Sequence, residues 1–242
     1  MQYMGGKSKI ARRLSEAILN NSESRQFYLE PFVGSAAVFV QMAPHFSWSV
    51  AGDAQPDLVM MWNALLFEGW EPPAEMPEER WRELRDAEPS PDRAFAGFDC
   101  SFAGRFFEGY ARDRTGRIDF ADKGRRGLLK VRESLTSSAL GRFRNWHYDQ
   151  WNPVPGTVIY CDPPYAGTKR YSSKRAGVPA FDHAHFWSKC REWASAGCEV
   201  FVSEYNAPDD IECIWSVEKL QTTKRPEQGR DVAVERLFKV VA

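Results

Sequence analysis

The sequence predicts an α/β fold built on a mainly parallel sheet, and two observations point to it. Apolar segments typical of strands alternate with segments of helical period in the first and last parts of the chain. The composition, with 43% hydrophobic and 27% charged residues, is that of a globular protein with a substantial core. The 242 residues are enough for one large domain or for one domain with an insertion.

The first region, residues 1–66, shows this alternation clearly. Ile10, Leu14 and Ile18 recur at helical spacing and predict an N-terminal helix. The elements expected next are a strand at 27–32, a helix at 36–43, a short strand at 47–53 and a helix from 57 to 66.

The last region, residues 151–242, returns to the same pattern. The elements expected there are a strand at 157–161, a helix at 182–195 and strands at 198–205, 214–220 and 234–241. Between these regions, residues 67–150 are polar, rich in proline early and basic late, and carry few strand signals. We therefore predict one α/β domain, formed by residues 1–66 and 151–242, that is interrupted by an inserted domain at 67–150.

Charge is strongly segregated although the net charge is only −1. Residues 68–92 hold nine acids and three bases, a net of −6, whereas residues 104–144 hold eleven bases and five acids, a net of +6. Basic segments interleaved with aromatic residues and glycines can bind a phosphate backbone. A solvated surface would show the same run of charge.

Several classes of protein are disfavoured. No apolar run approaches the roughly 18 residues that a membrane span needs, and the N-terminal segment lacks the apolar stretch of a signal peptide. The five cysteines are scattered and form no CxxC pair, so neither a disulfide framework nor a metal site is expected. We expect a cytoplasmic protein that has no membrane or metal partner.

The clearest motif is Asp162-Pro163-Pro164-Tyr165, directly after the strand segment 157–161. Proline has no N–H group and a fixed φ, so the chain must leave the sheet at the carboxyl end of this strand. Open α/β sheets bind their ligands at that edge. A carboxylate, backbone carbonyls and an aromatic ring suit a planar ring that carries an amino group. A strand-ending turn with a buried tyrosine is the alternative.

A second motif, Glu30 to Ala37, lies between a strand and a helix and contains Gly34. Small residues at such a turn let a ligand approach the backbone. Asp53 stands nineteen residues after Gly34, near the end of the next strand. This is the spacing at which an acid reaches ribose hydroxyls in nucleoside-binding α/β folds.

The third motif, Tyr3-Met4-Gly5-Gly6-Lys7-Ser8, lacks the earlier glycine and the preceding strand of a P-loop. An NTPase is therefore disfavoured, and a Gly-Gly bend could instead bring Lys7 to a ligand carboxylate. A flexible segment before a helix is the alternative.

Taken in order, YMGGKSKI, EPFVGSAAVF, AGDAQPDL and DPPY resemble the Dam-like D12 class of DNA adenine-N6 methyltransferases, the alpha group. Members carried by bacteriophages are resembled further by the segments GFDCSFAGRFFEGYARD, FDHAHFW and VFVSEYNAP. The resemblance runs from Tyr3 to the end of the chain and is weakest in the middle region. It implies a Rossmann-like class I sheet that binds S-adenosyl-L-methionine, with a mainly helical target-recognition domain inserted at 67–150. Ser35 and Ala36 stand where the family often has further glycines.

The resemblance also implies roles for individual residues. The cofactor would be bound by Tyr3, Lys7, Phe32, Val33, Gly34, Asp53 and Asp162. Lys7 would lie near its methionine carboxylate and Asp53 would hold its ribose hydroxyls. The residues implied in catalysis are Asp162, Pro163, Pro164 and Tyr165. Asp162 and the Pro163 carbonyl would accept the amino hydrogens of the target base, and Tyr165 would stack on the flipped adenine.

Double-stranded DNA is the expected partner, and we expect a monomer. Candidate contacts to its phosphates or guanines are Arg105, Arg112, Arg114, Arg117, Lys169 and Arg170. A restriction–modification role is left open, as are three alternative functions. These are transfer to cytosine N4, transfer to an RNA adenine, and DNA binding without catalysis. Asp162 favours adenine, because cytosine N4 enzymes more often have serine at this position.

Overall fold

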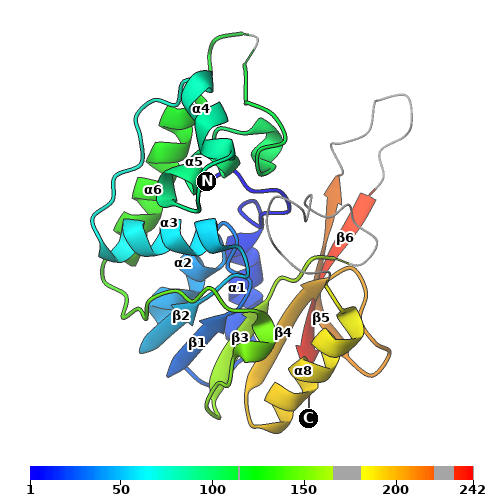
Figure 1. Ribbon diagram of the computed structural model, residues 1–242. Helices are drawn as coiled ribbons and strands as arrows, with labels where there is room; N and C mark the ends of the chain where they lie inside the picture. Colours follow the sequence, from blue (N-terminus) through cyan, green and yellow to red (C-terminus); the bar gives the residue numbers. More distant parts are fainter. Residues whose placement is uncertain (114, 166–180, 221–231, 242) are drawn as a thin grey trace.

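Six strands form one sheet at the centre of the molecule (Figure 1). The computed structural model describes residues 1–113, 115–165, 181–220 and 232–241. The strands are β1 (Phe27–Glu30), β2 (Trp48–Ala51), β3 (Thr157–Cys161), β4 (Glu199–Glu204), β5 (Glu212–Leu220) and β6 (Val232–Val240). Their order is β2-β1-β3-β4-β6-β5. The pairs β1–β2, β1–β3 and β3–β4 are parallel, whereas β6 runs antiparallel to both β4 and β5. The predicted α/β fold with a mainly parallel sheet is confirmed.

Helices cover the sheet and extend beyond one side of it. They are α1 (Ala11–Asn20), α2 (Phe39–Met42), α3 (Pro56–Phe67), α4 (Glu78–Arg85), α5 (Pro91–Phe98), α6 (Phe120–Leu135) and α8 (His183–Ser195), with 3-10 turns at Ala43–His45, Phe102–Gly104 and Tyr148–Gln150. Several begin at a side chain that accepts a backbone N–H, which satisfies a donor that the first turn leaves free. Ser90 accepts from Arg93 N, and Asp182 accepts from His185 N.

The helix expected at 36–43 is shorter than the sequence suggests. α2 begins only at Phe39, because the chain first makes a tight turn after β1. Gly34 has φ +44° and Ala36 has φ +56°, and the Ala36 N–H donates to Val33 O at 2.7 Å. This left-handed backbone is incompatible with a continuous helix. It keeps the segment after β1 close to the edge of the sheet.

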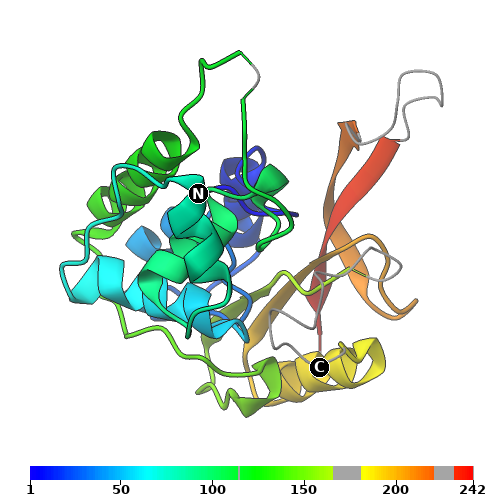
Figure 2. The same cartoon turned by 45° about the horizontal axis from the view of Figure 1, so that its top comes forward.

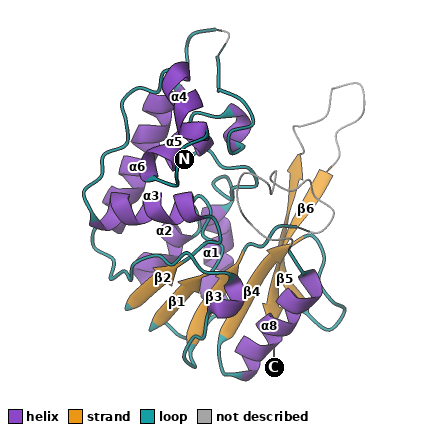
Figure 3. Ribbon diagram, viewed as in Figure 1, coloured by secondary structure: helices purple, strands orange, loops and turns teal. Residues whose placement is uncertain are grey.

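The two faces of the sheet pack against different helices (Figure 3). On one face, α8 buries Phe186 and Trp193 against β-strand residues such as Ile159. On the other face, α1 and α2 and the helices beyond them share a continuous apolar cluster with residues such as Tyr160 and Leu237. Side chains alternate between faces along a strand, which is why neighbouring β3 residues belong to different clusters.

Residues 67–150 contain α4, α5 and α6, which gather with α3 away from α8 in both views (Figures 1 and 2). Apolar side chains of these helices belong to the same cluster as α1–α3 and the sheet. That this region is a separate target-recognition domain stays a prediction. No helix among the described residues is both long enough and apolar enough to cross a membrane.

A buried ion pair joins α5 to α3. Arg93 Nη1 lies 2.5 Å from Asp57 Oδ2, and Asp57 Oδ1 accepts the Ser90 N–H at 3.0 Å. Both side chains are almost fully buried. A buried charge that loses its partner is strongly destabilising, since neither solvent nor protein then compensates it.

We therefore expect Asp57→Ala to lower the free energy of unfolding by about 3–5 kcal/mol, measured by urea denaturation. The control is Asp86→Ala, which removes the exposed pair between Arg85 and Asp86. That change should have little effect on stability, since exposed ion pairs contribute little. An equal, small effect of both substitutions would show that the pair does not hold α5 in place.

Candidate active site

The carboxyl ends of four strands meet at one edge of the sheet and line a cavity of about 570 Å³. Glu30 ends β1, Asp53 follows β2, Asp162 follows β3 and Tyr205 follows β4. β1 and β3 are neighbours in the sheet. The connection after β1 leads to β2 on one side, whereas the connection after β3 leads to β4 on the other side. Such a switch point opens a ligand crevice. The predicted motifs, distant in sequence, therefore converge. The predicted residues that line the cavity are Tyr3, Lys7, Phe32, Val33, Gly34, Asp53, Asp162, Pro163, Pro164 and Tyr165.

Asp162 lies against Lys7, which comes from the segment before α1. Lys7 Nζ is 2.6 Å from Asp162 Oδ1 and 2.8 Å from Oδ2. A second carboxylate, that of Glu235 on β6, lies 3.3 Å from the same nitrogen. Lys7 is 5% exposed, so its contacts with these two acids take place largely out of solvent. The structure thus brings one ammonium group between two carboxylates.

The protonation of this cluster follows from competing effects. Burial by itself would lower the pKa of Lys7, but Asp162 and Glu235 outweigh it and raise the pKa above its ordinary value. Burial raises the pKa of Asp162, and Lys7 works against this by stabilising the carboxylate. Lys7 therefore opposes the effect of burial and favours the carboxylate form of Asp162 at the edge of the sheet.

Tyr165 is held by contacts at both ends of its side chain. Its hydroxyl donates to Glu235 Oε1, and its ring lies edge-on to Tyr205 at 4.7 Å between centroids. Lys7 Nζ is 4.7 Å from the centroid of the Tyr165 ring. Pro163 is buried and Pro164 is exposed. The aromatic ring is thus oriented at the cavity by β6 and by the segment after β4.

Gly34 is required by the close approach of Tyr3. A Cβ atom at Gly34 would lie 3.0 Å from Tyr3 Cε1, and the residue has φ +44°, which favours glycine. The indole N–H of Trp62 donates to the Gly34 carbonyl at 3.0 Å and fixes the turn from α3. Phe32 faces Tyr148 with 5.6 Å between ring centroids, which forms an aromatic wall.

Asp53 accepts two backbone N–H groups, from Gly34 at 3.1 Å and from Gln55 at 3.0 Å. The carboxylate thereby connects the turn after β1 to the start of α3. Burial raises its pKa to about 6, although the backbone donors favour the ionised form. Asp53 is therefore close to its titration range under mildly acidic conditions.

The predicted site residues do not include several residues that line the cavity. The main ones are Glu30, Tyr148, Phe181, Tyr205 and Glu235. Glu30 is buried and accepts the Tyr28 hydroxyl at 2.8 Å. It lies within the second motif, but the sequence does not distinguish it from any other acid at the end of a strand. Glu235 interrupts the apolar strand pattern at 234–241, and a buried acid in a strand is a signal that could have found it.

The predicted DNA contacts lie outside this cavity. Arg105 pairs with Glu108 at 3.3 Å, Arg112 pairs with Glu78 at 2.5 Å, and Arg117 is exposed. Their roles stay predictions. Three further predicted contacts, Arg114, Lys169 and Arg170, lie outside the described residues.

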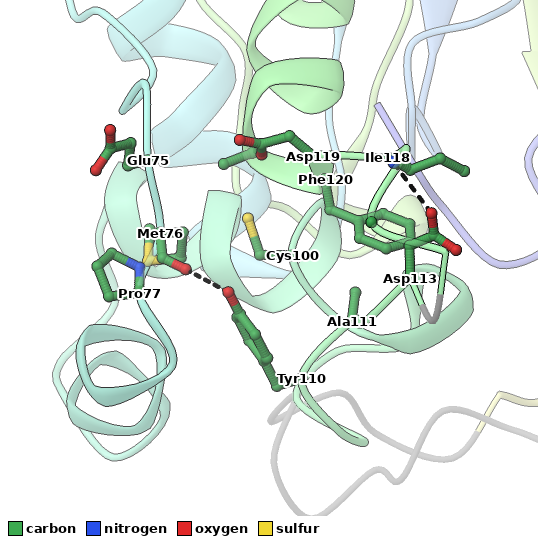
Figure 4. A pocket seen from close by; sticks show the side chains of 12 residues that line it. Glu75, Met76, Pro77, Cys100, Tyr110, Ala111, Asp113, Ile118, Asp119 and Phe120 are labelled. Carbon is green, nitrogen blue, oxygen red and sulfur yellow. Dashed lines mark hydrogen bonds between the residues drawn. The ribbon is translucent and has the colours of Figure 1, made fainter.

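A second cavity, of about 410 Å³, lies between the segment before α4 and the segment before α6 (Figure 4). It is lined by residues that precede α4, such as Met76, and by the segment that leads to α6. The Tyr110 hydroxyl donates to Met76 O at 2.7 Å across it. None of the predicted catalytic or cofactor residues lines this cavity.

Comparison with known proteins agrees with the motifs. Residues 3–91 match the family model of the D12 class N6 adenine-specific DNA methyltransferases. The predicted resemblance to this family is confirmed over the matched segment. The matched segment carries Lys7, the Gly34 turn and Asp53, three of the features that converge on the cavity. The matched family implies S-adenosylmethionine as the methyl donor of a methyltransferase. No curated protein matches the chain.

Solved structures of low sequence identity are also similar. One is the 23S rRNA methyltransferase ErmE, with 12% identity, TM-score 0.42 and coverage of 96% of this chain and 68% of that one. Another is a putative RNA methyltransferase from Pyrococcus horikoshii, with 7% identity, TM-score 0.42 and coverage of 97% and 85%. A putative methyltransferase from Escherichia coli, YhhF, has 11% identity, TM-score 0.39 and coverage of 96% and 86%.

The chemistry of the cavity fits S-adenosylmethionine. Among the described residues, the buried hydroxyl of Tyr148 has no hydrogen-bond partner, and it lies on the aromatic wall beside Phe32. Aromatic walls with a few convergent polar groups suit a nucleoside. The Asp53 carboxylate is an acceptor that would suit ribose hydroxyls, as the resemblance to the family implies. The described residues hold no cluster of three or more His, Cys, Asp or Glu side chains that could bind a metal ion.

The pKa of Asp53 leads to a pH dependence of cofactor binding. A carboxylate accepts hydrogen bonds from ribose hydroxyls better than a neutral carboxyl group does. Since the pKa is about 6, the acceptor form is present above this pH and is lost as the pH falls through it. We expect the dissociation constant for S-adenosylmethionine to rise by up to about tenfold for each pH unit below about 6, measured by calorimetry. In Asp53→Asn, affinity should be low and this pH dependence should be absent. Equal pH dependence in both proteins would contradict the role of Asp53.

Proposed function

We propose that the protein is a DNA methyltransferase that transfers a methyl group from S-adenosylmethionine to the N6 amino group of an adenine flipped out of the duplex. The observation that carries this proposal is the carboxylate of Asp162, paired with Lys7, beside an oriented Tyr165 ring at the edge of a cavity that suits a nucleoside. The family match over residues 3–91 supports the same reaction.

The amino group of adenine is a poor nucleophile because its lone pair is delocalised into the ring. When bound, the cofactor supplies a methyl group on a positively charged sulfur. Asp162 and the Pro163 carbonyl accept the two amino hydrogens, which favours a localised lone pair on the nitrogen. The Tyr165 ring stacks on the base and fixes its plane. Fixed acceptors at the reacting atom supply positioning and electrostatic stabilisation without a covalent intermediate.

DNA is the substrate that the charge distribution supports best. Residues 104–144 carry a net charge of +6, and Arg105 and Arg117 lie in this segment. Pairing of Arg105 and Arg112 with surface acids is weak in solvent, so phosphates can replace those partners. Extrusion of a base costs a few kcal/mol, and stacking on Tyr165 offsets part of this cost.

The experiment that tests the function is nucleoside mass spectrometry of unmethylated duplex DNA after incubation with purified protein and S-adenosylmethionine. We expect N6-methyladenine, and Asp162→Ala is the control for a contaminating activity. N4-methylcytosine would show that Asp162 does not select adenine, and methylation of RNA alone would show that DNA is not the substrate. If neither duplex DNA, single-stranded DNA nor RNA is methylated, a cofactor titration decides whether the protein is a DNA-binding module without catalysis.

A further inference from the structure

The carboxylate of Glu235 lies in the active-site cavity, although it belongs to none of the motifs that resemble the family. It stands on β6, and its side chain is 3% exposed. Leu237, two positions later, belongs to the apolar cluster on the α1 side of the sheet. Residues two apart on a strand point to the same face, so Glu235 faces the segment that carries Lys7.

Lys7 connects Glu235 to Asp162. Lys7 Nζ is 2.6 Å from Asp162 Oδ1 and 3.3 Å from Glu235 Oε1. An ammonium group has three protons and can donate to both carboxylates at once. The three side chains therefore form a continuous path along which a proton can move from Asp162 to Glu235.

The proposed reaction releases a proton next to Asp162. The N6 lone pair forms the bond to the methyl carbon, the bond from that carbon to sulfur breaks, and its electron pair stays on sulfur. The nitrogen is then positively charged and loses one hydrogen as a proton. Asp162 is the acceptor in contact with that hydrogen. However, Lys7 at 2.6 Å stabilises the charged form of Asp162 and so favours passing the proton on.

We propose that Glu235 is a positioning residue that receives this proton through Lys7. Asp162 takes the proton from N6, Lys7 Nζ passes one of its own protons to Glu235 Oε1, and Lys7 then accepts the proton from Asp162. Lys7 ends as an ammonium group, Asp162 as a carboxylate and Glu235 as a neutral carboxyl group that later gives its proton to solvent. Lys7 stabilises the Glu235 anion less than that of Asp162, since it is farther away. The hydrogen bond from the Tyr165 hydroxyl keeps Glu235 in place.

Other titratable groups around Glu235 do not replace it in this path. Those that interact with it electrostatically are Lys7, Tyr160, Asp162, Tyr165 and Tyr205. Burial raises the pKa of all three tyrosines, so they stay neutral in the physiological range. The neighbouring Arg236 donates to the backbone carbonyl of Tyr205 rather than to Glu235. Among the described residues, Glu30 also interacts electrostatically with Lys7 and Asp162, but its carboxylate accepts the Tyr28 hydroxyl.

This inference rests on the proposed function, and it is tested by rapid-quench, single-turnover methylation of duplex DNA from neutral to alkaline pH. We expect Glu235→Gln to slow methyl transfer by about 10- to 100-fold near neutral pH. The loss should shrink as the pH rises, because Lys7 then loses a proton to solvent and can itself take the proton from Asp162. Glu235→Asp keeps the carboxylate and should recover part of the rate. The matched control is Glu204→Gln, which changes a buried acid of β4 that accepts the Tyr205 N–H at 2.7 Å.

A second measurement needs neither cofactor nor DNA. Titration of the Lys7 Nζ signal by NMR should show a lower pKa of Lys7 in Glu235→Gln, because one of the two carboxylates that raise it is gone. Glu204→Gln should leave this pKa unchanged. A rate loss of equal size at every pH, an unaffected rate, or an unchanged pKa of Lys7 would overturn the role of Glu235. An inactive wild-type protein would instead overturn the proposed function, and the proton path with it.

Discussion

Replacing Asp162 by alanine is expected to reduce methyl transfer by at least about 10³-fold while binding of S-adenosylmethionine stays measurable. In the proposed mechanism Asp162 accepts an amino hydrogen, so its loss removes the group that localises the amino lone pair. The substitution should not unfold the site, because Lys7 keeps Glu235 as a partner at 3.3 Å.

The measurement is transfer of a labelled methyl group to duplex DNA, together with a calorimetric cofactor titration and a melting curve. The control is Glu199→Ala, which removes a carboxylate at the amino end of β4, where it accepts the backbone N–H groups of Glu23 and Ser24. This variant should retain activity. Turnover of Asp162→Ala at the wild-type rate would refute the mechanism.

Replacing Lys7 by methionine is expected to lower kcat by about 100-fold or more at neutral pH. Lys7 is the group that lowers the pKa of Asp162 against the effect of burial. Without it the pKa of Asp162 rises further, the neutral carboxyl group predominates up to a higher pH, and the acceptor is lost. Activity should therefore fall as the pH decreases through this raised pKa and recover in part at alkaline pH.

The same variant distinguishes two roles for Lys7. If Lys7 contacts the methionine carboxylate, as the family resemblance implies, the KM for the cofactor rises while kcat at saturating cofactor stays near its wild-type value. If Lys7 keeps Asp162 ionised, kcat falls and its pH profile moves to higher pH. Measuring both parameters over a range of pH separates these outcomes.

The local sequence pattern was sufficient to predict most of the elements of the fold. The segment 157–161 coincides with β3, because a run of apolar, β-branched residues that ends in two prolines has few other conformations. α8 begins one residue after the start of the segment predicted at 182–195, because Asp182 is its N-cap. The helix at 36–43 was predicted too long, since small apolar residues give no sign of the left-handed turn at Ala36.

By itself, the sequence determined the α/β architecture, the resemblance to the family, and the motifs that line the cavity, because these depend on residue type and spacing within short segments. Only the tertiary structure decided what those motifs touch. Lys7 and Asp162 are 155 residues apart in sequence and their side chains meet at 2.6 Å. Glu235 joins them because β6 enters the sheet between β4 and β5, antiparallel to both. The order and direction of strands depend on packing across the whole chain, and so does the pairing of charges at the edge of the sheet.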